Sequence, residues 1–162
     1  MEGDQSWSDS WRSFFGIGPD SYQRAVDILT KRYIEESQHV ARFTEHAQRM
    51  QYPQFRQNLL AIAADEAKHV ELIGEKLKQL GARLPNVPPI SAGTKNSWQY
   101  LLEDLTEQQR CAEELMELAQ NIHQEAPDIA ELLERIYQDG SRHREIIRDM
   151  LMKSDPQSLW PT

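Results

Sequence analysis

Apolar residues recur every three or four positions in four long segments of the chain, which is the spacing of one face of an α-helix. The first segment begins near Asp20 or Ser21, both of which are good helix caps, and runs to about residue 50. The others cover about residues 54–80, 97–122 and 127–153. Because no segment alternates as a strand does, the pattern predicts an all-α protein.

The connections between these segments predict how the helices are arranged. The first two are separated only by a short turn containing Pro53, whereas residues 83–96 carry three prolines and a glycine and are long enough to cross a small domain. Short, long and short connections indicate two antiparallel hairpins joined by one crossover. We therefore expect a four-helix bundle over residues 21–154, preceded by an arm (1–20) and followed by an irregular tail (155–162).

Large aromatic residues recur at helical spacing within the N-terminal arm, before two glycines and a proline break the pattern. They are Trp7, Trp11, Phe14 and Phe15. An amphipathic arm of this kind docks on its own bundle, on a second copy of the chain or on a partner protein. We expect a homodimer, and a protein partner bound through the arm is the alternative.

Composition excludes several classes of function. The net charge of −8 argues against binding nucleic acid or an anionic membrane through a basic face. No apolar run is long enough for a membrane-spanning helix, and the N-terminus lacks the apolar core of a signal peptide. Cys111 is the single cysteine, so no internal disulfide or cysteine-based metal knuckle can form. A cytoplasmic protein is expected.

The two predicted hairpins resemble each other in sequence. At an offset of 74 residues, Pro53 matches Pro127 and His69 matches His143. Polar residues or a glycine also interrupt the apolar stripes near the middle of each helix. These interruptions are Glu36, Glu66, His69, Gln108, Gly140 and His143.

Buried carboxylates are costly unless they are paired or bound to a metal. Glu66 and His69 are three residues apart on one helix face, so both can reach the same ion. Carboxylate oxygen and imidazole nitrogen suit iron, manganese or zinc. The alternative is a buried hydrogen-bond network that fixes the register of the helices without a metal.

With 36-ESQ-38 on the first helix and 66-EAKH-69 on the second, the chain resembles the ferritin-like superfamily and is most similar to the rubrerythrins. That family builds a di-iron site from one Glu on each of two helices and an ExxH motif on each of the other two. The resemblance implies that Glu36, Glu66, His69 and His143 are metal ligands. It also implies oxygen or peroxide chemistry with iron.

The second half departs from that pattern, because Gln108 and Gly140 stand where the family has glutamates. We therefore predict an incomplete di-metal site holding one or two ions, with Gln108, Glu107 and His39 as possible additional ligands. Cys111 aligns with His39 and is another candidate. Glu107 and Asp139 adjoin the two altered positions, but each is turned about 100° away from the inner face.

Two other functions remain open. One is a non-catalytic bundle that has lost its metal and acts through oligomerisation or a protein partner. The other is a zinc hydrolase that uses the same ligands. Tyr33 and Tyr137 lie near the site and are either core residues or hydrogen-bond partners of ligands, and we expect His46 and His123, near helix ends, to be solvated.

Overall fold

The computed structural model describes residues 18–91 and 93–154, and within these ranges it contains α-helices and no strand. The helices are α2 (Pro19–Arg49), α3 (Pro53–Gln79), α4 (Ser97–Ile122) and α5 (Pro127–Lys153). The predicted all-α, ferritin-like bundle is confirmed. The predicted arm, up to residue 17, and the predicted tail lie outside the described residues.

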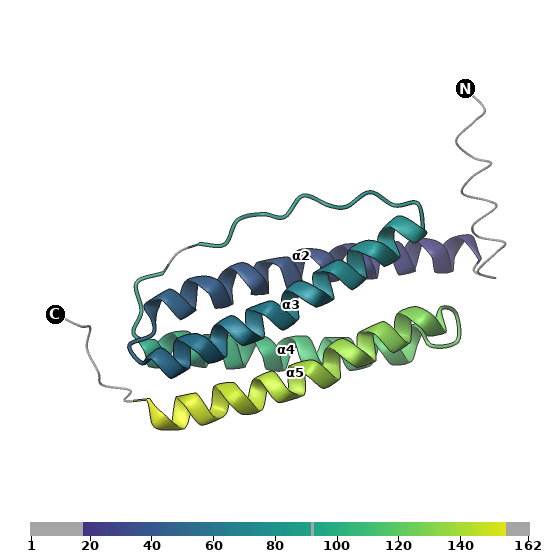
Figure 1. Cartoon of the computed structure of the whole chain (residues 1–162). Coiled ribbons are helices and arrows are strands. Elements are labelled where there is room, and N and C mark those ends of the chain that lie inside the picture. Colours follow the sequence, from purple (N-terminus) through teal and green to yellow (C-terminus); the bar gives the residue numbers. More distant parts are fainter. Residues whose placement is uncertain (1–17, 92, 155–162) are drawn as a thin grey trace.

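The helices form two antiparallel hairpins that face each other. α2 packs along α3 and α4 packs along α5, while α2 meets α4 and α3 meets α5 between the hairpins. The crossover from α3 to α4 runs along the length of the bundle on the side of the first hairpin (Figure 1). Among the described residues, no helix is long and apolar enough to cross a membrane.

Local signals in the sequence account for most helix ends. Asn96 and Gln99 form a reciprocal capping box at the start of α4. α3 ends at Gln79, and Gly81 follows its C-cap Leu80 with a φ of 73°, the left-handed conformation that glycine adopts without strain. α2 begins slightly earlier than predicted: Gly18 is its N-cap, without a side-chain hydrogen bond, and Pro19 occupies its first turn.

Two apolar clusters fill the bundle, one toward each end. One cluster contains Leu29, Ile73, Leu77, Leu115, Ile122 and Leu133. The other contains Phe43, Phe55, Leu59, Tyr100, Leu101 and Ile147. The residues that interrupt the apolar stripes lie in sequence between the members of these two clusters on each helix, so a polar layer separates the clusters at mid-length.

The prediction that His46 is solvated is wrong. Its side chain is only 4% exposed, because α2 continues to Arg49 and places His46 on the face that packs against α4. Its Nδ1 lies 2.8 and 2.9 Å from the two carboxylate oxygens of Asp104, which is also buried. His123 is exposed, as predicted.

Candidate metal centre

Two buried glutamates from the first hairpin lie at the centre of the polar layer. Glu36 on α2 and Glu66 on α3 are each 2% exposed. Burial, followed by the charge of Glu66, raises the pKa of Glu36. Burial also opposes ionisation of Glu66, but hydrogen bonds from His143 and His69 outweigh it and hold the pKa of Glu66 well below its usual range. Glu66 is thus the fixed negative charge of the pair.

Three buried histidines direct their Nδ1 atoms toward these glutamates. His69 Nδ1 lies 2.9 Å from Glu66 Oε2 and 3.4 Å from Glu36 Oε2. His143 Nδ1, from α5, lies 3.3 Å from Glu66 Oε1. His39 Nδ1 lies 4.0 Å from Glu36 Oε2. The structure therefore brings together Glu36, Glu66, His69 and His143, and it places beside them His39, which the sequence predicts as a possible additional ligand.

The outer nitrogen of each of these histidines faces a second carboxylate. His69 Nε2 lies 3.0 Å from Asp139 Oδ2, and His39 Nε2 lies 3.4 Å from Glu107 Oε1. His143 Nε2 lies 3.3 Å from an oxygen of the third acid, which is Asp65. A carboxylate on the outer nitrogen fixes the tautomer and orientation of an imidazole, and it is the usual support of a metal-binding histidine.

The sequence does not predict Asp65 at the site, and it offers Glu107 as a possible additional ligand and Asp139 as a neighbour of an altered position. The structure gives all three the role of orienting a histidine. A signal for them exists in the sequence, because each immediately precedes an inward-facing position: Glu66, Gln108 or Gly140. The rotation of about 100° per residue that turns them from the inner face is what carries them to the outer side of the rings.

Hydrogen bonds and neighbouring charges, rather than burial, determine the direction in which the pKa values of two of the histidines shift. Burial by itself would lower the pKa of His39 and of His69. For His39, hydrogen bonds with Cys111 and Glu107 outweigh burial and raise the pKa to about 10. For His69, hydrogen bonds with Glu36 and Glu66 raise the pKa to about 10. In the metal-free protein these imidazoles are therefore charged at neutral pH.

This protonation predicts how the stability of the metal-free protein depends on pH. Both pKa values are raised on folding from 6.5 to about 10, so the stabilisation is complete below pH 6.5 and is lost as the pH rises through 10. The free energy of unfolding, measured with urea after chelation of metal, should fall steadily over that interval. A free energy that stays level there would contradict the assignment, and the fall should be smaller in His39→Gln.

The second half of the site carries an amide and a guanidinium in place of carboxylates. Gln108 Nε2 donates to Glu66 Oε1 over 2.9 Å. A Cβ atom at Gly140 would lie 3.4 Å from both Arg144 Nη1 and Gln108 Oε1. Arg144 is 9% exposed, donates to the backbone oxygen of Gln108 over 3.5 Å and lies 5.5 Å from the centre of the Tyr137 ring. The space left by the glycine thus faces a buried cation.

Some buried polar atoms of the site form no well-aligned hydrogen bond among the described residues and have only contacts of 3.3–4.0 Å with oppositely charged groups. They include Glu36 Oε2, His39 Nδ1 and His143 Nδ1. Ligand atoms of Glu36, His39 and Glu66 all lie within 4.8 Å of one another. Beside them is a cavity of about 10 Å³, bordered also by Gly140, which is roughly the space that one water molecule needs. Ligand atoms that lack a well-aligned hydrogen bond and lie beside such a space fit a bound ion.

The remaining candidates lie outside this centre. Cys111 Sγ is 3.8 Å from His39 Nε2 and 3.6 Å from Glu107 Oε1, so it contacts the outer side of the His39 ring. Tyr33 packs on the first apolar cluster, where its ring would meet a Cβ atom at Gly74 at 3.2 Å. Tyr33 is therefore a residue of the apolar packing.

Fold and site together define the class of protein: a ferritin-like four-helix bundle with two buried glutamates and an ExxH motif in its first hairpin. The family model described as Rubrerythrin matches residues 27–151, which is most of the chain. The chain belongs to the rubrerythrin family. Among curated proteins, none matches its sequence.

Solved structures of ferritin-like proteins share the fold. The bacterioferritin of Desulfovibrio desulfuricans, described as having a diiron site, is 21% identical with a TM-score of 0.74 over 82% of this chain and 81% of its own. A dodecameric thioferritin from Bacteroides fragilis is 15% identical with a TM-score of 0.73 over 82% and 86%. Dps from Thermosynechococcus elongatus is 17% identical with a TM-score of 0.73 over 86% and 98%. At these identities the similarity establishes the fold alone.

Proposed function

We propose that this protein binds one transition-metal ion, iron in the first place, at the centre of its first hairpin. The ligands would be Glu36 and His39 of α2 with Glu66 and His69 of α3. The observation that carries the proposal is the orientation of the histidines, whose inner nitrogens converge on two buried glutamates while carboxylates hold their outer nitrogens. Manganese and zinc suit the same oxygen and nitrogen ligands.

The second ion of a di-metal site does not fit these residues. On the side of Glu66 Oε1 the chain offers His143 Nδ1, but the amide of Gln108 already donates to that oxygen. Gly140 supplies no ligand, and the guanidinium of Arg144 lies beside the vacated space. A buried positive charge next to a divalent cation is strongly unfavourable in a low-dielectric interior. We therefore propose one ion, with His143 as a hydrogen-bond partner of Glu66.

Iron bound at this position would supply oxidation–reduction chemistry with oxygen or peroxide, as expected of a rubrerythrin-like oxidoreductase. The residues of the chain would position and shield that chemistry. Asp139 and Glu107 hold the outer protons of His69 and His39, so that their inner nitrogens are free to bind the ion. The apolar clusters on both sides exclude bulk water, and the small space beside Gly140 would admit one small oxidant.

The proposal is tested by metal analysis of the protein purified from iron-supplemented cells. We expect close to one equivalent of iron per chain, together with reoxidation of the reduced protein by oxygen or peroxide. A metal-free sample should take up one equivalent of Fe(II). A protein that is isolated empty and that binds none of iron, manganese and zinc on addition would refute the proposed function.

A second candidate function is a non-catalytic bundle that acts by oligomerisation or through a partner protein. It is favoured by the partners that the buried acids already have, because Arg32 Nη2 donates to Glu36 Oε1 over 2.8 Å and Gln108 donates to Glu66. In that case added metal should leave the thermal unfolding temperature unchanged. An increase that depends on metal concentration would instead support the metal centre.

A further inference from the structure

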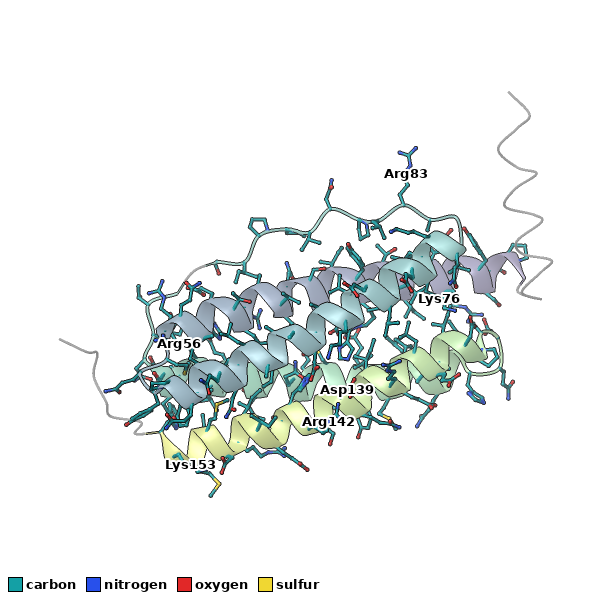
Figure 2. The ribbon with its side chains drawn as sticks, in the orientation of Figure 1. Arg56, Lys76, Arg83, Asp139, Arg142 and Lys153 are labelled. Carbon is teal, nitrogen blue, oxygen red and sulfur yellow. The ribbon has the colours of Figure 1, made fainter. Side chains whose placement is uncertain are left out.

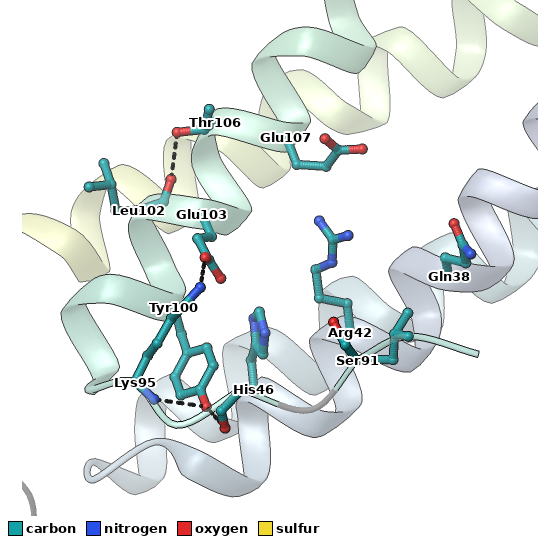
Figure 3. Close-up of a pocket in the computed structure, with 12 residues that line it drawn as sticks. Gln38, Arg42, His46, Ser91, Lys95, Tyr100, Leu102, Glu103, Thr106 and Glu107 are labelled. Atoms are coloured by element: carbon teal, nitrogen blue, oxygen red, sulfur yellow. Dashed lines mark hydrogen bonds and ion pairs between the residues drawn. The ribbon is translucent and has the colours of Figure 1, made fainter. Parts of the chain in front are cut away.

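A second cavity, separate from the metal centre, lies between α2, α4 and the crossover. It encloses about 580 Å³ and opens to solvent beside residues of the crossover (Figure 3). This volume lies within the range of sites that bind small molecules. Its lining is mostly polar and includes Gln38, Arg42, His46, Lys95, Tyr100 and Thr106. Only Glu107 is shared with the surroundings of the metal centre.

A carboxylate–histidine pair forms part of the cavity wall. Asp104 is 1% exposed, and both of its oxygens lie within 2.9 Å of His46 Nδ1. The carboxylate therefore holds a proton on Nδ1 and fixes the orientation of the ring. His46 Nε2 has no hydrogen-bond partner among the described residues, although the His46 ring lines the cavity. A buried acid thus orients a nitrogen that is free to meet a ligand.

Arg42 supplies a cationic group to the same cavity. It is four residues from His46 and thus on the same face of α2, and both side chains extend from α2 into the space in front of α4 (Figure 3). Within the described ranges, no carboxylate forms an ion pair with Arg42. The other charges of the wall are neutralised, because Lys95 pairs with Glu103, and Glu107 pairs with Arg110. Arg42 is therefore the cation of the cavity wall that is left available to a ligand, with the buried carboxylate of Asp104 as a compensating charge.

The wall next to Arg42 and His46 is held in place. The Tyr100 hydroxyl donates to the backbone oxygen of Gly93 over 2.5 Å and accepts from the backbone N–H of Lys95 over 3.2 Å. Its ring lies 4.4 Å from the His46 ring, centroid to centroid. Gln38 Nε2 donates to the backbone oxygen of Pro88. The crossover is thereby fixed against α2 and α4, so the cavity is formed before a ligand enters.

We propose that this cavity binds a small molecule carrying a carboxylate or phosphate group. The guanidinium of Arg42 matches two oxygens of such a group, as planar donors do. His46, whose ring is oriented by Asp104, would present Nε2 to a polar group of the same molecule. The remaining volume would take the rest of the molecule, which meets the neutral groups of Gln38 and Thr106. This assignment does not depend on a metal in the bundle.

The test titrates the full-length, metal-free protein with succinate, inorganic phosphate and neutral succinamide, using calorimetry and the NMR signals of the His46 ring. Succinate or phosphate should bind and shift those signals, whereas succinamide should not. Arg42→Gln should weaken binding about tenfold or more, as expected for a charge-assisted hydrogen bond. The control is Arg83→Gln, which makes the same charge change on the crossover where the side chain points into solvent (Figure 2).

Each outcome decides the proposal. Binding by either anion that weakens in Arg42→Gln and not in Arg83→Gln supports it, and the preferred anion identifies the class of ligand. Failure of both anions to bind overturns it, as does equal weakening in the two variants, which would reflect net charge alone. Loss of binding in Glu66→Gln would place the anion at the metal centre and would also overturn the assignment.

Discussion

Glu66→Gln should abolish metal binding while leaving the bundle folded. The substitution keeps the shape of the side chain but removes the negative charge that lies 2.9 Å from His69 Nδ1 and 3.3 Å from His143 Nδ1. Losing an outer hydrogen-bond partner of a ligand costs roughly 10- to 100-fold in metal affinity, and the loss of a ligand itself should exceed that. Iron content and Fe(II) titration of the purified variant measure the effect.

Glu75→Gln provides the matched control for this prediction. It makes the same chemical change on α3 at an exposed position and should leave iron content unaltered. Circular dichroism of both variants checks that the helices persist. If Glu66→Gln retains iron at the wild-type level, the ion is held elsewhere and the assignment of Glu66 fails.

Gln108→Glu combined with Gly140→Glu should raise the capacity of the protein from one metal ion to two. The two substitutions return carboxylates to the second half of the site, where His143 already faces Glu66. A side chain at position 140 first meets Arg144 Nη1 and Gln108 Oε1, both at 3.4 Å. Both atoms are at the ends of flexible side chains and can move. Titration of the metal-free variant with Fe(II) measures the number of iron ions bound per chain.

Gly140→Ala is the control for side-chain volume at position 140, and this variant should still bind one metal ion per chain. Adding Arg144→Gln to the double variant distinguishes the effect of the Arg144 charge from the effect of the restored carboxylate ligands. Two ions in the triple variant but one in the double variant would mean that the guanidinium itself excludes the second ion. If the double and the triple variant each bind one ion, His143 cannot act as a ligand of a second ion even when carboxylates are restored, and the prediction fails.

The helices and their connections could be read from the sequence because each signal is local. The three- and four-residue spacing of apolar residues, the glycine at position 81 and the prolines at 53 and 127 determine helices over a few turns without reference to the partner helix. The inward glutamates were also identifiable, since a carboxylate inside an apolar stripe needs a compensating charge wherever the stripe is buried.

The partners of these groups could not be predicted in the same way. Arg32 has no measurable exposure and donates to Glu36, yet on the sequence it is one of many arginines. The pairing of His46 with Asp104 joins residues 58 positions apart, and proximity to a helix end suggested a solvated histidine. Such contacts depend on the rotation and offset of one helix against another, which local periodicity does not specify.

The proposed ligands Glu36, His39, Glu66 and His69 all belong to α2 and α3, which adjoin along the chain. This has a consequence for the order of assembly during synthesis. During synthesis, the first hairpin emerges from the ribosome with its complete ligand set before α4 and α5 emerge. An ion taken up at that stage would join the two helices while their apolar faces still lack a partner. A centre whose ligands are divided between both hairpins has to wait for the last helix.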